Sequence, residues 1–491
     1  MTTPDDQSRR PDFAPPPDFA PPDPATREPR GVVVTWLIAL LACLAIISSG
    51  WIARTIIPPA DPPFPGADPG IVLMTRVALG MQEMGLPGTA GFDLRAIERE
   101  LTPLDELRDA PQSRQRTGDL ATHLRLAIIL AEFGDADAAR DTIETIASFD
   151  ELPEPIAEDV ATLHRFYIVG DRDTPFESGF RERHGWFAEL AAIHQLDRAD
   201  SAERAAILDD AVRRVVALFV FGGGFIIASL ASLVLFIVGI VLLFGRQIRM
   251  RHRIPSDEPG IVNIAALETF TLFVVAFAII KFASSLLENA NLSEGTLALA
   301  GIALLGAQWA LALLVLWPLL RGVPLRHYTN ALGVPRLLHI PREIFAGIAG
   351  YFALLPIVVL GFFITLGLTA IFDAQPSHPI QDEMAAGADP LIWLLIFSLA
   401  VVWAPFVEEA IFRGFLYHHC RRFVGIILSA LVTGFLFAAI HPQGWTFVPV
   451  LMALGINFAL LRAWRGTLVA PITAHALHNG AILTLAFFLI A

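Results

Sequence analysis

Two adjacent glutamates and an arginine lie inside an apolar stretch of this chain. Glu408, Glu409 and Arg413 interrupt the run LIWLLIFSLAVVWAPFVEEAIFRGFLY, which is otherwise typical of a membrane-spanning helix. A charged side chain at the centre of a bilayer costs about 2.5 kcal/mol or more to insert, so such residues are usually kept for a function. The stretch is therefore the first candidate for chemistry carried out within the membrane.

The spacing of these three residues suggests a division of roles. Glu409 and Arg413 are four residues apart, so on a helix they share a face and can form an ion pair. Glu408 is rotated by about 100° from Glu409 and can face a polar cavity, where a carboxylate can act as general base on water. The alternative is that all three form a buried polar cluster that only holds helices together.

A histidine closes the next apolar stretch, VGIILSALVTGFLFAAIHP. This residue, His441, follows Phe437 by four positions, so the two share a helix face. An imidazole at this place could orient a water molecule held by Glu408. The alternative is a histidine that caps a helix end just before Pro442.

The last apolar stretch contains the sequence ITAHALHNG. His475 and Asn479 are four residues apart on one helix face, and each offers an N–H group. Two converging donors in a dry cavity are what a tetrahedral oxyanion requires. His478 is three residues from His475 and could share this face, although a hydrogen bond between helices would explain it equally well.

Three ordered motifs in these stretches resemble those of the CAAX-protease and bacteriocin-processing (CPBP, Abi) family of intramembrane endopeptidases. The motifs are Glu408-Glu409-x-x-x-Arg413, Phe437-x-x-x-His441 and His475-x-x-x-Asn479. The resemblance covers about residues 340–491. Carried over by position, it implies activation of water by Glu408 and His441, an oxyanion held by His475 and Asn479, and support from Glu409 and Arg413.

The resemblance leaves two kinds of water activation open. Glu408, His441 and His475 could supply three zinc ligands, but the chain contains no HExxH sequence. The ligand chemistry favours a glutamate-dependent reaction without metal, so we expect no cofactor and keep zinc as the alternative.

Composition places the chain among polytopic membrane proteins. It has 491 residues, of which 54% are hydrophobic and 17% charged. The net charge of −13 is concentrated in residues 54–212, which hold 30 Asp and Glu against 15 Arg. An acidic soluble segment argues against nucleic acid as a partner. The partners we expect are membrane lipids and a membrane-associated or lipidated peptide substrate.

Nine apolar stretches predict an all-α, polytopic transmembrane helix bundle of about nine spans with an extramembrane α-helical insert. The predicted divisions are a disordered Pro-rich tail (1–30), a signal-anchor helix (31–53), an acidic helical extracytoplasmic domain (54–212), transmembrane helices with basic loops (213–339) and a CPBP-type protease domain (340–491). By the positive-inside rule, the N-terminus is cytoplasmic and the insert lies outside. Arg213 and Arg214, on the outer side of the second span, fit this topology least well. The expected location is a bacterial plasma or inner membrane.

The insert offers no catalytic constellation, and its histidines lack metal-ligand spacing. Its stretch LAEFGDADAARDTI resembles a tetratricopeptide-type helical hairpin, which suggests a protein partner at this domain. Near the other end of the chain, His418 and His419 flank a basic turn and are expected to meet lipid headgroups.

The function favoured by these residues is an intramembrane endopeptidase that hydrolyses a peptide bond of a membrane-associated peptide or protein. The alternative is a non-catalytic membrane scaffold or bacteriocin-immunity protein, in which the polar motifs only stabilise the bundle. A secondary transporter is a weaker alternative, because the two halves of the chain carry no inverted repeat.

Overall fold

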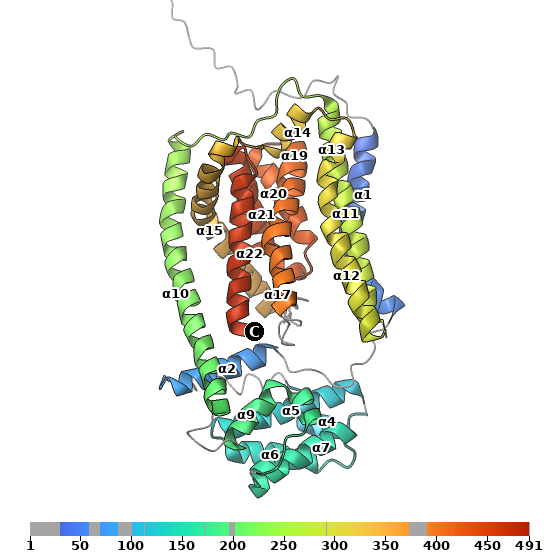
Figure 1. Cartoon of the computed structure of the whole chain (residues 1–491), viewed down its shortest axis with the longest axis vertical. Helices are drawn as coiled ribbons and strands as arrows, with labels where there is room; N and C mark the ends of the chain where they lie inside the picture. The colour runs from blue at the N-terminus through green and yellow to red at the C-terminus, as the bar shows by residue number, and fades with distance from the viewer. Residues whose placement is uncertain are drawn as a thin grey trace, which may run out of the picture.

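The computed structural model is built from α-helices joined by loops (Figure 1). It describes residues 30–57, 69–86, 101–111, 113–171, 173–195, 202–290, 292–372 and 390–490. Within these ranges no residue lies in a β-strand, so the prediction of an all-α chain is confirmed. The predicted Pro-rich tail lies outside the described residues except for Arg30.

Eight helical segments of the described chain are long and apolar enough to cross a membrane. They are formed by α1 (Arg30–Ile56), α10 (Ala202–Phe244), α11 (Gly260–Asn289), α12 (Glu294–Ala310) with η5 (Leu311–Leu316) and α13 (Trp317–Leu320), α14 (Leu325–Leu332) with η6 (Leu337–His339) and α15 (Ile340–Ile371), the helical run 390–421, α21 (Val448–Arg465) and α22 (Val469–Ile490). The polytopic bundle is therefore confirmed.

One of the nine apolar stretches, residues 423–441, forms a helix that is too short to cross a bilayer by itself. This helix, α20 (Ile426–Ala439), has 14 residues, whereas a transmembrane helix needs about 20. It begins after Gly425, and a turn at His441 and Pro442 follows its end. The bundle therefore combines eight long segments with one short helix, where the sequence predicted about nine spans.

The acidic insert forms a layer of short helices at one end of the bundle (Figure 1). These are α2 (Pro69–Glu83), α4 (Leu104–Asp109), α5 (Arg114–Glu132), α6 (Ala136–Ala147), α7 (Glu154–Leu163), η4 (His164–Val169), α8 (Ser178–His184) and α9 (Trp186–Gln195). Gly134, with φ of 97°, separates α5 from α6, and the Asp135 side chain caps α6 by accepting from the Ala138 N–H. These helices bury a shared apolar core. The tetratricopeptide-type assignment stays a prediction.

The long helix α10 connects the insert to the bundle (Figure 1). Its 43 residues extend over about 65 Å, roughly twice the thickness of the hydrocarbon core. Arg214 on this helix is buried. Its guanidinium pairs with Asp210 at 2.9 Å and donates to the Leu489 carbonyl of α22 at 2.5 Å, so its polar groups have partners. Of the two arginines that fitted the predicted topology least well, Arg214 is thus paired inside the protein, whereas the Arg213 side chain is 74% exposed.

The arginine-rich loops gather at the end of the bundle opposite the insert. The loop after α10, the loop between α13 and α14, and the turn after α19 (Tyr417–Arg421) lie at that end (Figure 1). The acidic and basic segments of the chain are therefore separated by the full height of the bundle.

Helix α21 packs against α15, α20 and α22 and so lies at the centre of the C-terminal helices. It crosses α20 at two glycines, because a Cβ atom on Gly455 would lie only 2.6 Å from the Cα of Gly434. Small residues at such a crossing let two backbones approach closely within a membrane. The crossing brings the backbone carbonyls of α21 within reach of the helical run 390–421.

Candidate active site

The two glutamates lie in a helical run that alternates between α and π geometry. The run consists of α17 (Pro390–Phe397), η7 (Ser398–Trp403), α18 (Ala404–Glu409), η8 (Ala410–Leu416) and α19 (Tyr417–Arg421), with η7 and η8 as the π-helical parts. π-helical turns are rare and are frequent at functional sites. Glu408 and Glu409 are the last two residues before the second π-helical part.

A proline accounts for one unusual contact of this run. In a π-helix a carbonyl accepts from the N–H five residues later, so the Ala400 carbonyl would pair with residue 405. That residue is Pro405, which has no N–H. The side-chain amide of Asn479, from α22, donates to the Ala400 carbonyl at 2.8 Å instead. An amide nitrogen carries two hydrogens, so Asn479 has a further N–H to offer.

Glu409 and Arg413 form a fully buried ion pair. The guanidinium Nη1 of Arg413 lies 2.9 Å from Glu409 Oε1, and both side chains are 0% exposed. Arg413 Nη2 donates to the Gly455 carbonyl at 2.9 Å, which uses the close crossing of α20 and α21. The guanidinium carbon also lies 4.6 Å from the ring centre of Phe437 and 5.2 Å from that of Phe458. Arg413 is thus fixed on several sides.

Glu409 also holds His475. The Nδ1 atom of His475 lies 3.0 Å from Glu409 Oε1, and its ring stacks on Phe458 with centroids 4.8 Å apart. Because a carboxylate oxygen only accepts, Nδ1 carries the hydrogen and Nε2 points the other way. His475 Nε2 lies 4.0 Å from Glu408 Oε2. The two glutamates therefore contact opposite nitrogens of one imidazole.

Glu408 differs from its neighbour in both exposure and pairing. Its side chain is 15% exposed, whereas that of Glu409 is 0% exposed. No described residue makes a hydrogen bond to Glu408 Oε2, although this atom is buried. A buried carboxylate oxygen with no protein donor has the capacity to hold a water molecule.

His441 follows the C-terminal end of α20. Its Nδ1 donates to the Phe437 carbonyl at 2.6 Å, so the hydrogen of the neutral ring is on Nδ1 and Nε2 carries a lone pair. The Phe437 ring lies 4.5 Å from the His441 ring and 5.9 Å from the His475 ring, centroid to centroid. Phe437 therefore links the two histidines.

The short length of α20 places His441 part-way through the bundle. The 14 residues of α20 span about 21 Å, which is less than the thickness of the hydrocarbon core, and the chain turns at His441 directly afterwards. Had the stretch 423–441 crossed the whole membrane, His441 would lie nearer the opposite face than Glu408 does.

Four of the six predicted site residues contact one another directly, and the other two are connected to them through a neighbouring residue. Glu408, His475, Glu409 and Arg413 form a continuous chain of contacts in that order. His441 reaches this chain through Phe437, and Asn479 reaches the helical run through Ala400.

The described residues hold no group of three His, Cys, Asp or Glu side chains arranged to bind a metal ion. His475 Nδ1 is bonded to Glu409 and His441 Nδ1 to a carbonyl, so each ring could offer only Nε2. Glu408, His441 and His475, the alternative zinc ligands of the sequence analysis, do not form such a group.

The chain was compared with known proteins. Residues 390–481 match the family model described as Type II CAAX prenyl endopeptidase Rce1-like, a range that includes all six candidate residues. The chain is also 30% identical over 125 residues to the membrane-embedded CAAX protease MroQ of Staphylococcus aureus (strain USA300). That alignment covers 24% of this chain and 49% of the relative, so the chain spans about half the length of the curated relative. No solved structure matches the chain.

The segment 390–481 is similar to CAAX prenyl endopeptidases. The resemblance drawn from the three motifs is confirmed by both comparisons. The matched range begins at the first residue of α17 and ends within α22, so it contains the helical run, α20 and α21.

The prediction for two histidines of the matched segment 390–481 is wrong. His418 and His419 were expected to meet lipid headgroups, yet they are 1% and 2% exposed. His418 lies 2.9 Å from Glu258 Oε2, and His419 Nε2 accepts from the Trp36 indole N–H at 3.2 Å. They are buried because α1 and the loop before α11 cover this side of α19, which hydropathy alone does not reveal.

Several contacts of the matched segment 390–481 could not be predicted from the motifs. The carbonyls of Ala400 and Gly455 and the ring of Phe458 all hold motif side chains. Only Pro405 indicated one of these contacts. A proline in an apolar helix has no N–H, so it leaves a preceding carbonyl, here that of Ala400, without a backbone donor. For His478, the hydrogen bond between helices is present, since Nδ1 lies 3.0 Å from the Tyr351 hydroxyl of α15.

Proposed function

We propose that this protein is an intramembrane endopeptidase that hydrolyses a peptide bond of a membrane-associated peptide or protein. The observation that carries the proposal is the pair of unequal glutamates on either side of His475. Glu409 contacts both Arg413 and His475, while Glu408 is partly exposed and keeps one oxygen without a donor among the described residues. The match of this segment to CAAX proteases supports the same activity.

Glu408 acts as general base in the proposed reaction. It takes a proton from water as the water oxygen attacks the scissile carbonyl, and it returns a proton to the leaving amine. His441 accepts a hydrogen bond from the same water through Nε2, because its Nδ1 hydrogen is held by the Phe437 carbonyl. Two acceptors then orient one water molecule.

His475 and Asn479 stabilise the oxyanion. A donor role for His475 requires a hydrogen on Nε2 as well as on Nδ1, which is the imidazolium form. Its positive charge would face the negative charge that develops on the substrate oxygen. Asn479 offers the amide hydrogen that is not bonded to Ala400. Glu409 and Arg413 are positioning residues in this scheme.

We propose that the reaction proceeds without a metal cofactor. The support is the donor set itself, since the three candidate ligands do not converge on one point. An assay with and without a chelator tests this part of the proposal separately from the activity.

The proposed setting is a bacterial plasma or inner membrane, with the N-terminus and the arginine-rich loops in the cytoplasm. Substrate reaches Glu408 from the bilayer or from the cytoplasmic side. The acidic insert would then lie outside, where it could bind a protein partner or select substrates.

The proposal is tested by the origin of the new carboxyl group. Purified protein would be incubated with a library of membrane-tethered peptides in water enriched in oxygen-18, with and without a chelator. We expect peptide products whose new carboxyl terminus contains one oxygen-18 atom, in equal yield in both arms. Intact peptides throughout would contradict the proposed hydrolysis, and loss of product only with chelator would contradict the metal-free reaction.

A further inference from the structure

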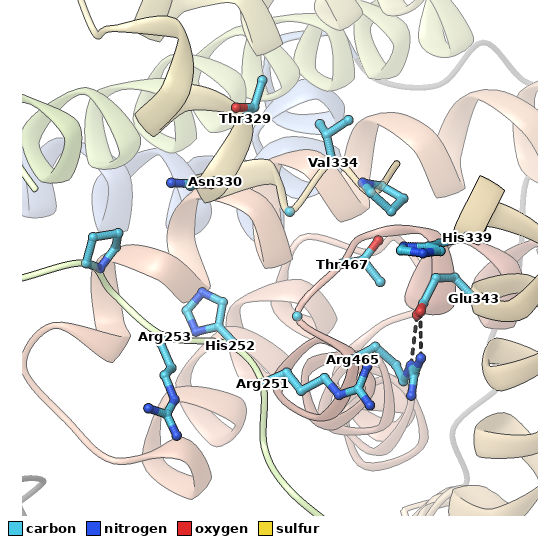
Figure 2. A pocket seen from close by; sticks show the side chains of 14 residues that line it. Arg251, His252, Arg253, Thr329, Asn330, Val334, His339, Glu343, Arg465 and Thr467 are labelled. Atoms are coloured by element: carbon cyan, nitrogen blue, oxygen red, sulfur yellow. Dashed lines mark hydrogen bonds and ion pairs between the residues drawn. The ribbon is translucent and has the colours of Figure 1, made fainter. Parts of the chain in front are cut away.

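A polar pocket lies at the end of the bundle that carries the arginine-rich loops. It has a volume of about 420 Å³ and is lined by residues of the loop 251–255, the turn 329–335 and the turn 465–467, together with His339 and Glu343 (Figure 2). None of these residues belongs to the candidate active site. Pockets of this size accommodate small molecules or the headgroups of larger ones.

Backbone contacts hold the walls of this pocket in place. The backbone N–H groups of Arg251 and His252 donate to the Ala463 carbonyl of α21 at 2.9 and 3.1 Å. Gly333 and Gly466 both have positive φ, of 62° and 71°, and a Cβ atom on Gly333 would collide with the Gly466 carbonyl. Three segments far apart in the sequence are therefore packed backbone to backbone, and the pocket does not depend on mobile side chains alone.

The pocket has a surplus of positive charge. Of its three arginines, only Arg465 is paired, through two contacts of 2.8 and 2.6 Å with Glu343 (Figure 2). No carboxylate among the described residues pairs with Arg251 or Arg253, which leaves a formal surplus of two positive charges with the histidines neutral. The carbonyls at the end of α14 do not need these arginines, because buried Arg462 already donates to two of them.

A buried histidine adds a polar group without a protein partner. His252 is 7% exposed, and neither of its ring nitrogens makes a hydrogen bond to a described residue. Burial, together with the positive charge of Arg462, lowers the pKa of His252 well below its usual value, so the ring is neutral and offers one N–H. Such a group within a protein normally has a partner, and here the pocket is the space available for one.

We propose that this pocket binds a phosphate group, carried either by a membrane lipid headgroup or by a soluble phosphate compound. Guanidinium groups recognise phosphate through paired N–H donors, and a surplus of two positive charges matches the charge of a phosphate. The His252 N–H and the hydroxyl of Thr467 add donors, since Thr467 accepts from the Val469 N–H and can still donate its own hydrogen. The volume beyond one phosphate accommodates the group to which it is attached. Basic pockets of this kind between membrane helices bind anionic headgroups.

Direct binding to the purified full-length protein tests the proposal. The four probes would be phosphatidylglycerol, inorganic phosphate, glycerol 3-phosphate and diacylglycerol, which lacks phosphate. The readouts are bound mass in native mass spectrometry and the shift in melting temperature. We expect at least one phosphate probe to bind and to raise the melting temperature, and diacylglycerol to do neither. Binding of phosphatidylglycerol alone would identify a lipid headgroup site, whereas binding of a soluble probe would identify a site for free phosphate compounds.

Matched variants separate the pocket from the general charge of the membrane face. Replacing both pocket arginines in Arg251→Gln/Arg253→Gln should weaken binding at least tenfold. The control Arg246→Gln/Arg249→Gln removes two exposed arginines from the same loop outside the pocket and should leave binding unchanged. If the double variant is unfolded in the absence of ligand, the single variant Arg253→Gln replaces it in the binding measurement. Equal binding by pocket and control variants, or no binding of any phosphate probe, would overturn the proposal.

Discussion

Glu409 Oε1 contacts both Arg413 Nη1 and His475 Nδ1, at 2.9 and 3.0 Å. One oxygen atom thus connects the cation of the first motif to the imidazole of the third, and Glu409 and His475 are 66 residues apart in the sequence. The contact leaves His475 Nε2 directed at Glu408, 4.0 Å away. In the proposed reaction Glu409 orients the His475 ring and Glu408 activates the water molecule.

Arg413→Gln should destabilise the protein strongly. Removing one partner of a fully buried ion pair costs about 3–5 kcal/mol, and it leaves the Glu409 carboxylate with His475 alone. The substitution also removes the donor to the Gly455 carbonyl. We expect a large drop in the melting temperature of the purified protein in detergent.

Arg321→Gln is the matched control for this prediction. It breaks the ion pair between Arg321 and Glu268, in which the Arg321 side chain is 41% exposed. Its melting temperature should fall much less, because an exposed pair contributes little to stability. Equal losses in the two variants would contradict a special place for Arg413.

His441→Ala should lower the rate of cleavage by about 100-fold or more, with little effect on melting. The imidazole is half-buried at the end of α20, and its loss removes an acceptor for the attacking water rather than a core side chain. Single-turnover cleavage of a tethered peptide measures this rate. His478→Ala is the control, since that ring bonds to Tyr351 and should be dispensable for the chemical step.

Asn479→Ala should lower kcat by about 100- to 1,000-fold while KM changes little, as expected for loss of an oxyanion donor. The lost hydrogen bond to the Ala400 carbonyl should cost about 1 kcal/mol of stability. Steady-state kinetics and melting are measured on the same preparation. A variant that is less stable but keeps its kcat would assign Asn479 to the π-helical turn alone.

The insert should lose stability as the pH falls below the ordinary histidine pKa. His184 is 0% exposed and bonded to Asp159, with Arg125 and Arg183 close by. Burial, the largest cause, lowers the pKa of His184 in the folded state. The unfolded chain therefore binds the proton first, and stability decreases as pH drops through about 6.5, by at most about 1.4 kcal/mol per pH unit.

Hydrogen exchange of the segment 154–195 in the full-length protein measures this effect. Protection should be high at pH 7.5 and lower at pH 5.5, after correction for the intrinsic exchange rate. His184→Gln should reduce the difference, because its amide keeps a donor for Asp159 and does not titrate. His164→Gln, at a half-buried histidine of the same insert, should leave the difference unchanged. A pH effect that persists in His184→Gln would assign it to other groups.

Much of the fold and of the motif chemistry could be predicted from the sequence because both depend on local spacing. Hydropathy revealed the bundle, and the four-residue interval between Glu409 and Arg413 indicated a pair that the structure contains. The length of α20 was harder to predict, since an apolar stretch has the same appearance whether it crosses the bilayer or turns at His441. That turn decides whether the first two motifs meet.

Contacts with the backbone of distant helices could not be predicted. Arg413 donates to the Gly455 carbonyl and Asn479 to the Ala400 carbonyl. Because every residue has a backbone carbonyl, the sequence does not indicate which one accepts. The burial of His418 beside Glu258 likewise depends on which helices cover α19. Such information is present only in the three-dimensional arrangement.

The most direct test of the account is the cleavage rate of Glu408→Gln beside that of Glu268→Gln. Both substitutions replace a membrane glutamate by its uncharged isostere, but Glu268 pairs with Arg321 and Trp317 away from the site. With both variants folded, as judged by melting, the account predicts that Glu408→Gln loses all measurable cleavage of a tethered peptide and that Glu268→Gln keeps it. Full activity of Glu408→Gln would contradict the assignment of Glu408 as the base that activates water.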